Sequence, residues 1–190
     1  SLKCAQELSD AQVDVMGYAC LVAIMSMGRG YHCVSEVNLH QETVANDFPT
    51  PIVTSAGALI NGLKILGAKQ ISIITPYMRP LTDMVVDYIE NQGIKVKESI
   101  ALEIPDNLEV AAQNPMNLLE IYKQLDLTDV DVLVVSACVQ MPSLEAIDII
   151  QAECGIPVTS AAVCTTYEMM KKLGIEAKSA IGGELLNGKY

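Results

Sequence analysis

Short apolar runs alternate with longer amphipathic segments along the chain. The apolar runs predict strands, and the segments between them have helical periodicity. The predicted strands are residues 13–19, 51–54, 70–75, 95–102, 131–137 and 157–160. The predicted helices are residues 56–66, 80–92, 116–125, 143–153 and 162–173. Strands that alternate with helices are typical of a parallel sheet with crossover helices on its faces.

Glycine and proline positions support these boundaries. A glycine directly follows several of the predicted helices, as it does where a helix ends in a left-handed residue. These glycines are Gly67, Gly93, Gly155 and Gly174. Pro80 and Pro115 stand where the first turn of a helix accepts proline.

The pattern occurs twice. VDVMGYACLVAIM, from Val13 to Met25, resembles VDVLVVSACVQMP, from Val130 to Pro142, and residues 51–69 resemble residues 157–178. Each half gives a strand ending in Ala-Cys, a helix, a strand into Val-Thr-Ser-Ala, and a helix ending at Leu-Gly. Convergence of similar α/β units is one explanation. We favour duplication, because strand or helix propensity does not require the cysteine or the Thr-Ser-Ala sequence.

The duplication predicts an α/β fold of two similar lobes with parallel sheets, related by a pseudo-two-fold axis. We expect residues 1–67 and 169–190 in the first lobe and residues 68–168 in the second. The chain begins at Ser1 with what looks like a helix already under way. We therefore expect that an N-terminal portion, including a strand of the first lobe, is missing.

Composition narrows the class of protein. The 190 residues are 51% hydrophobic, 18% charged and only 4% aromatic, which indicates a folded aliphatic core. The net charge of −11 argues against binding to nucleic acid. No apolar run reaches the length of a membrane span and no signal peptide is evident, so we expect a cytoplasmic protein that binds no membrane.

Two of the six cysteines are candidates for chemistry. No CxxC spacing points to zinc, and a core-rich chain without a secretion signal does not suggest a disulfide scaffold. Cys20 and Cys138 each stand where a strand ends and a helix begins, the edge at which parallel sheets bind ligands. Two thiols from pseudo-symmetric lobes would face one cleft. One, as a thiolate, would act as nucleophile or base, and the other, as a thiol, would act as acid. The other four, Cys4, Cys33, Cys154 and Cys164, are interpreted as small buried hydrophobes.

The same edge suits an anion in spite of the net charge. Backbone amides after the two cysteines would cradle a carboxylate. These amides belong to Leu21, Val22, Val139 and Gln140. Tyr77, in TPYMRP, falls at the same edge but is equally compatible with a surface turn, and Asn107, in IPDNLE, is usually structural in such a turn.

Several segments together resemble the maleate cis-trans isomerase family, within the cysteine-dependent Asp/Glu racemase superfamily. They are GYACLVAIM, VTSAGAL, ITPYMRPL, ALEIPDNLEV, DLTDVDVLVVSACVQMPSL and GGELLNGKY, and the resemblance extends over essentially the whole chain. It implies two Rossmann-like lobes with the active site between them.

The resemblance also implies roles. Cys20 would be the nucleophile and Cys138 the proton donor, while Tyr77, Asn107 and the backbone after both cysteines would bind the two carboxylates of maleate. No cofactor or metal is implied, and a homodimer is expected. The family also uses an asparagine from the loop after the first strand, which nothing in this chain matches.

Other functions stay open from the residues alone. An Asp/Glu-type racemase would use the same two thiols as base and acid. An enzyme similar to arylmalonate decarboxylase would need only one of them. A dicarboxylate-binding protein without activity is the non-enzymatic alternative.

Overall fold

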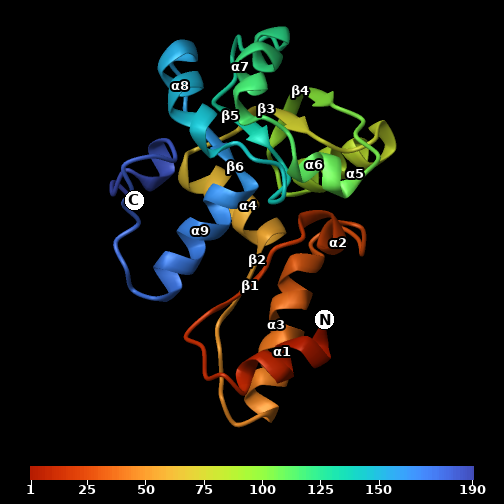
Figure 1. Cartoon of the computed structure of the whole chain (residues 1–190), viewed down its shortest axis with the longest axis vertical. Coiled ribbons are helices and arrows are strands. Elements are labelled where there is room, and N and C mark those ends of the chain that lie inside the picture. Colours follow the sequence, from red (N-terminus) through yellow and green to blue (C-terminus); the bar gives the residue numbers. More distant parts are fainter.

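The structure, a computed structural model, describes residues 1–190 and contains two separate parallel sheets (Figure 1). The first sheet pairs β1 (Met16–Tyr18) with β2 (Ile52–Thr54). The second has the order β4-β3-β5-β6, with β3 at Gln70–Thr75 and β4 at Lys95–Ala101. Its remaining strands are β5 (Val132–Ser136) and β6 (Val158–Ser160). All strand pairs are parallel, which confirms the predicted α/β class.

The helices lie between the strands and at both ends of the chain. The α-helices are α1 (Leu2–Ser9), α2 (Leu21–Met25), α3 (Tyr31–Ala45), α4 (Ser55–Ile65), α5 (Arg79–Asn91), α6 (Asn107–Ala111), α7 (Leu118–Ile121), α8 (Leu144–Cys154) and α9 (Ala161–Lys172). Short 3-10 turns are η1 (Pro115–Asn117), η2 (Tyr122–Gln124) and η3 (Glu184–Leu186). No helix combines the length and the apolar character that crossing a membrane requires.

The sequence predicted all six strands, but it extended the first one too far. Only Met16, Gly17 and Tyr18 pair, because β2 offers three partners: Ile52, Val53 and Thr54. The predicted helix at residues 116–125 is a short α-helical turn between η1 and η2, so it is not continuous. The bounds of α3 and α6 were not predicted. The glycines after α4, α5, α8 and α9 all have positive φ, as expected of helix ends.

The two halves share a continuous core in which α4 and α9 pack against each other (Figure 1). They are the equivalent helices of the sequence repeat, since α4 follows β2 and α9 follows β6. Their close approach depends on Gly62, where a Cβ atom would lie 2.6 Å from the Cys164 Sγ atom. The lobe boundaries stay a prediction, because the shared core does not itself divide the chain.

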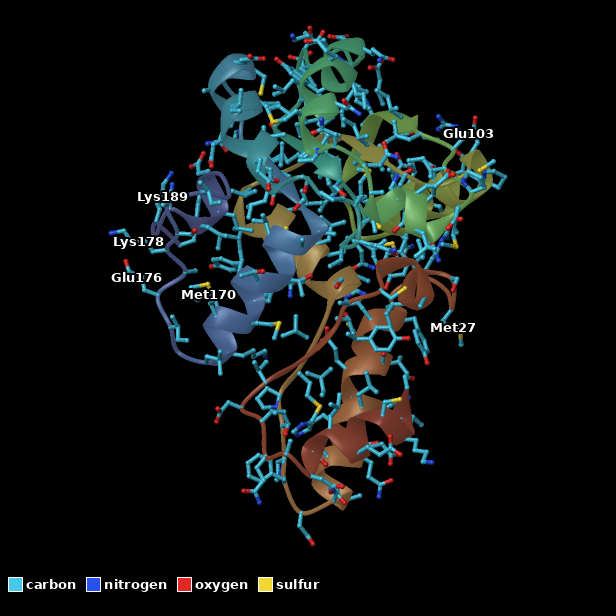
Figure 2. All side chains as sticks on the ribbon, in the orientation of Figure 1. Met27, Glu103, Met170, Glu176, Lys178 and Lys189 are labelled. Atoms are coloured by element: carbon cyan, nitrogen blue, oxygen red, sulfur yellow. The ribbon has the colours of Figure 1, made fainter.

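Charged side chains of the C-terminal segment are exposed at the molecular surface (Figure 2). The labelled examples there are Glu176, Lys178 and Lys189. Beneath them η3 is buried through Leu185 and Leu186. Backbone amides of Gly182 and Gly183 donate to the Asp148 carboxylate of α8, at 3.1 and 2.9 Å. These contacts fix the end of the chain against the four-stranded half.

Candidate active site

The two candidate cysteines follow equivalent strands. Cys20 lies two residues beyond β1 and is the residue before α2, whereas Cys138 lies two residues beyond β5. Cys20 is exposed and Cys138 is buried, at 7% of its maximal accessible surface. Because both strands run parallel to their neighbours, both thiols stand at a carboxyl edge, where ligands bind in α/β proteins.

A small cavity of about 110 Å³ brings the predicted residues together. At roughly 30 Å³ per water in the liquid, that volume suits a compact ligand of a few heavy atoms. Every residue predicted from sequence lines it: Cys20, Leu21, Val22, Tyr77, Asn107, Cys138, Val139 and Gln140. Sequence reasoning missed only two lining residues, Ala19 and Val110, which carry no chemical group that would signal a site.

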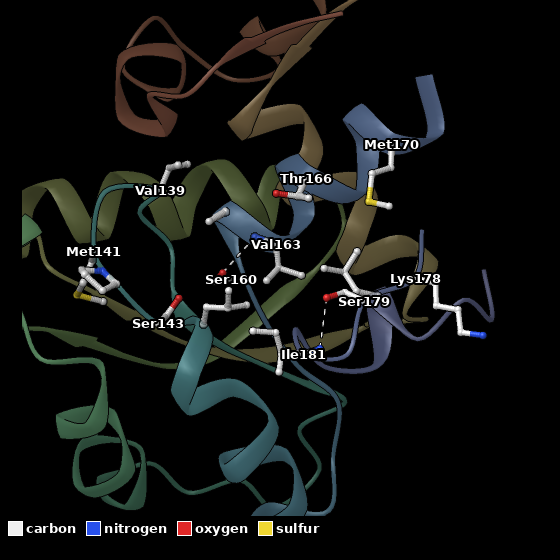
Figure 3. Close-up of a pocket in the computed structure, with 14 residues that line it drawn as sticks. Val139, Met141, Ser143, Ser160, Val163, Thr166, Met170, Lys178, Ser179 and Ile181 are labelled. Carbon is white, nitrogen blue, oxygen red and sulfur yellow. Dashed lines mark hydrogen bonds between the residues drawn. The ribbon is translucent and has the colours of Figure 1, made fainter. Parts of the chain in front are cut away.

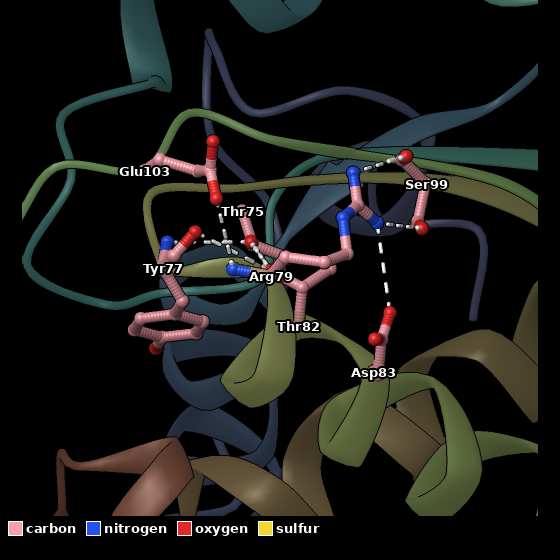
Figure 4. A network of polar contacts seen from close by, with 7 residues as sticks. All are labelled: Thr75, Tyr77, Arg79, Thr82, Asp83, Ser99 and Glu103. Atoms are coloured by element: carbon pink, nitrogen blue, oxygen red, sulfur yellow. Dashed lines mark hydrogen bonds and ion pairs between the residues drawn. The ribbon is translucent and has the colours of Figure 1, made fainter.

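Tyr77 is held by the turn between β3 and α5 (Figure 4). Its N–H donates to Thr75 Oγ1 at 3.3 Å, and the Thr75 and Thr82 hydroxyls are 2.6 Å apart. The backbone N–H of Glu103 donates to the Tyr77 carbonyl at 3.2 Å. Arg79 anchors the outer side through hydrogen bonds to Ser99 at 3.0 and 3.3 Å. The turn is therefore tied to both its own helix and the neighbouring strand.

The Tyr77 hydroxyl lies beside the second cysteine loop. It donates to the Ala137 carbonyl at 3.2 Å. Burial, and then the proximity of Cys138 and Cys20, raise the pKa of Tyr77 well above its usual value. The phenol therefore stays neutral, and its one proton can pass from the Ala137 carbonyl to an anion in the cavity when the hydroxyl rotates.

Asn107 differs from its prediction in local structure. It is the first residue of the short helix α6, and not part of a turn, because Asp106 caps that helix by accepting from the Leu108 N–H at 2.7 Å. The Gln140 side chain donates to the Asn107 carbonyl at 2.7 Å. Gln140 thus ties α6 to the loop that carries Cys138, while the Asn107 side-chain amide makes no hydrogen bond within the chain.

Backbone amides beside both cysteines are available to a ligand. Leu21 and Val22 form the first turn of α2, whose N–H groups have no acceptor within the helix. The N–H groups of Val139 and Gln140 donate to no group of the chain. Two pairs of unpaired donors thus lie at one cavity, a suitable arrangement for two carboxylates of one small molecule.

The other cysteines have different surroundings. Cys164 is fully buried, and burial raises its pKa to about 12, consistent with a structural residue. The interpretation of Cys4 and Cys33 as buried was wrong, because both lie on exposed faces of α1 and α3. Cys154 is half-buried at the end of α8.

A larger cavity of about 470 Å³ is lined by residues of the loop after Cys138, of α9 and of the C-terminal segment (Figure 3). It shares only Val139 with the thiol cavity. Two of its hydroxyl groups accept hydrogen bonds from the chain, Ser160 from the Val163 N–H and Ser179 from the Ile181 N–H. No cysteine lines it, so size alone does not make it the site of chemistry. No cluster of three or more His, Cys, Asp or Glu residues is arranged to hold a metal ion.

Comparisons with known proteins show the family of this chain. A family model described as arylmalonate decarboxylase matches residues 2–186. The maleate isomerase of Geobacillus stearothermophilus is 54% identical over 99% of this chain and 75% of its own length. The chain belongs to the maleate isomerase family.

Solved structures of maleate isomerases have nearly the same fold. The Pseudomonas putida S16 enzyme, a cysteine-to-alanine variant crystallised with maleate, superposes with a TM-score of 0.98 at 57% identity. The superposition covers all of this chain and 76% of the Pseudomonas putida S16 chain. A Nocardia farcinica maleate isomerase variant with a covalently bound succinylcysteine intermediate has a TM-score of 0.95 at 38% identity, over all of this chain and 77% of its own. Arylmalonate decarboxylase, at 17% identity with a TM-score of 0.80, shows the fold alone.

Proposed function

We propose that this chain is a maleate isomerase that converts maleate to fumarate without a cofactor, through a succinyl adduct on Cys20. The observation that carries the proposal is the convergence of Cys20, Cys138 and Tyr77 on one small cavity lined by unpaired backbone amides. A relative that holds a succinylcysteine intermediate supports the covalent route. The racemase alternative has no comparable support from the comparisons.

The chemistry starts with addition. Maleate is a cis alkene whose double bond does not rotate at ambient temperature. The Cys20 thiolate forms a C–S bond to one olefinic carbon, and the π electrons move to the other carbon and its carboxylate. The amide N–H groups after the cysteines and the neutral Tyr77 hydroxyl stabilise that charge.

Proton transfer and rotation complete the cycle. The Cys138 thiol gives its proton to the carbanionic carbon, which leaves a succinyl group on Cys20 and a thiolate on Cys138. The central bond is now single and rotates. Cys138 then removes a proton from that carbon, the new double bond forms, and the C–S bond breaks to release fumarate and the Cys20 thiolate. Atoms and charges balance with no metal, flavin or nicotinamide.

A pair of cysteine variants tests this proposal. We expect Cys20→Ala to abolish conversion of maleate, measured by loss of the cis acid and gain of fumarate, while circular dichroism stays unchanged. Cys138→Ser keeps the thiol at position 20 but should lose most turnover, because a serine hydroxyl is a far weaker acid than a thiol and supplies no thiolate to remove the proton in the release step. An adduct of one maleate that is protonated by solvent should then remain on the peptide containing Cys20.

Cys33→Ser is the matched control, since Cys33 is exposed and lies outside the cavity. It should keep wild-type turnover. Near-normal turnover by folded Cys20→Ala, or an adduct found only on Cys33 or Cys4, would disprove the assignment of the nucleophile. The assembly of the chain into a homodimer stays part of the proposal, and size-exclusion chromatography with light scattering tests it.

A further inference from the structure

Helix α2, which directly follows Cys20, packs against helix α5. Leu21, Ile24 and Met25 of α2 are buried in the same core as Val85 and Tyr88 of α5. Apolar packing of this kind favours contact but sets direction weakly, because the hydrophobic effect is not directional. Directional polar contacts are therefore needed to fix the position of Cys20 relative to the four-stranded half.

Two side-chain pairs supply all hydrogen bonds between residues 1–54 and residues 70–160. Arg29, in the loop between α2 and α3, pairs with Asp87 of α5, with Nε to Oδ2 at 3.0 Å. His32, in the first turn of α3, pairs with Tyr88 of α5. Both pairs connect the part of the chain that follows Cys20 to helix α5, which follows Tyr77.

The two pairs differ in burial. The Arg29 and Asp87 side chains are 61% and 51% exposed, so water and salt screen their attraction. Tyr88 and His32 are 1% and 8% exposed. A polar atom left unpaired at such a buried position costs its full desolvation penalty. The buried pair therefore has the stronger hold on the relative placement of α3 and α5.

The hydrogen atoms of the buried pair follow from its contacts. The Tyr88 hydroxyl oxygen accepts from the His32 backbone N–H at 3.1 Å. Its own proton is then directed to His32 Nδ1, 2.6 Å away. This places the imidazole proton on Nε2 and leaves Nδ1 as an acceptor. Three buried polar atoms are satisfied together in a single relative position of the two helices.

We propose that the His32–Tyr88 pair is a positioning device that fixes Cys20 relative to Tyr77 and Cys138 across the cavity. The inference rests on the proposed function for its kinetic consequence but not for its geometric one. Tyr88 and His32 line no part of the thiol cavity and touch no reacting atom. They act through α2 and α5, whose ends present Cys20 and Tyr77. Rates that depend on two groups meeting one substrate fall steeply with small misplacements, by about 100-fold for about 1 Å.

The kinetic test removes one hydroxyl. Tyr88→Phe keeps the ring in the core and deletes both hydrogen bonds. We expect kcat for maleate to fall by about 10- to 100-fold while KM changes by less than about threefold, since the amides beside each cysteine remain. Tyr122→Phe is the matched control, because it deletes the hydroxyl of another buried tyrosine, bonded to Glu153 at 2.7 Å, outside the cavity. Asp87→Asn controls for the exposed pair. Both controls should keep kcat.

The geometric test does not depend on turnover. Dibromobimane, a short reagent that joins two thiols, should cross-link Cys20 to Cys138 in the wild-type chain, detected by peptide mass spectrometry. The yield should fall at least about threefold in Tyr88→Phe but not in Tyr122→Phe. His32→Asn should retain cross-linking and kcat, because its side-chain oxygen replaces Nδ1 as acceptor.

The outcomes separate this inference from the proposed function. A wild-type chain that does not isomerise maleate would overturn the function and leave the cross-linking result to decide the positioning role. Wild-type kinetics or cross-linking in Tyr88→Phe would overturn the positioning role. So would absence of the cross-link in the wild-type chain, or equal losses in Tyr88→Phe and Tyr122→Phe.

Discussion

The surroundings of the Tyr77 side chain determine how its hydroxyl can interact with a substrate. Its phenol is half-buried, donates to the Ala137 carbonyl, and is kept neutral by burial and by the two nearby cysteines. A neutral hydroxyl can donate to the carboxylate of bound maleate and also to the negative charge that develops when the thiolate adds. Its contribution should therefore appear in catalysis as well as in binding.

We expect Tyr77→Phe to lower kcat/KM by about 10- to 100-fold, equivalent to roughly 1.5–3 kcal/mol for a hydrogen bond to a charged group. A loss confined to KM would indicate contact with the ground-state carboxylate alone. A loss in kcat as well would place the hydroxyl near the charge that builds after thiolate addition. Steady-state kinetics on maleate decide between them, with Tyr122→Phe as the control. Unchanged kinetics would show that the backbone amides hold the carboxylates by themselves.

Helix α3 carries a titratable group into an interface between elements. Burial is the main cause that lowers the pKa of His32 from its usual 6.5. Glu36 on α3 opposes this shift and Lys64 on α4 adds to it, while Tyr88 on α5 faces Nδ1. Since the pKa is lower in the folded state, the folded state disfavours the protonated imidazole. The stabilisation by neutral His32 is complete above about pH 6.5 and is lost as the pH falls through the lowered value.

We therefore expect the wild-type chain to lose more unfolding free energy than His32→Asn between about pH 7 and about pH 5. Asparagine keeps an acceptor for Tyr88 but does not titrate. Urea denaturation of both proteins at each pH measures the difference, and carboxylates that titrate in both chains cancel. Parallel stability profiles would mean that His32 has the same proton affinity in the folded and unfolded states.

The contact between α4 and α9 joins the two halves of the whole molecule. A Cβ atom at Gly62 would lie 2.6 Å from the Cys164 Sγ atom and 3.2 Å from both the Cys164 Cβ and Leu185 Cδ2 atoms. We expect Gly62→Ala to lower the unfolding free energy by about 1–3 kcal/mol through overpacking. Cys164→Ala removes the closest atom, so the double variant should be less destabilised than the sum of the two single variants.

Chemical denaturation of these three variants measures this effect. A fall in the transition midpoint at unchanged slope is expected for Gly62→Ala. Additive losses in the double variant would mean that the helices move apart instead of pressing on Cys164. Helix propensity works in the opposite direction, because alanine favours a helix over glycine by about 1 kcal/mol. A net loss would therefore show that packing outweighs propensity at this contact.

The amino-acid sequence determined the features that depend on local physics. Alternation of apolar runs with amphipathic segments predicted all six strands, and glycines with positive φ marked the helix ends. The repeat placed Cys20 and Cys138 at equivalent strand ends, and the resemblance added Tyr77 and Asn107. Local pattern carries this information because side-chain period and helix termini are properties of a few consecutive residues.

Tertiary structure decided what depends on residues far apart along the chain. The first strand is short because β2 supplies only three partners, and α6 is tied to the Cys138 loop because the Gln140 side chain, 33 positions away, donates to the Asn107 carbonyl. No local signal joins His32 to Tyr88, which are 56 positions apart, or makes Gly62 the point where two helices meet. The sequence by itself thus predicted which groups line the thiol cavity. Only the packing of one half against the other determined how those groups are held in reach of a single ligand.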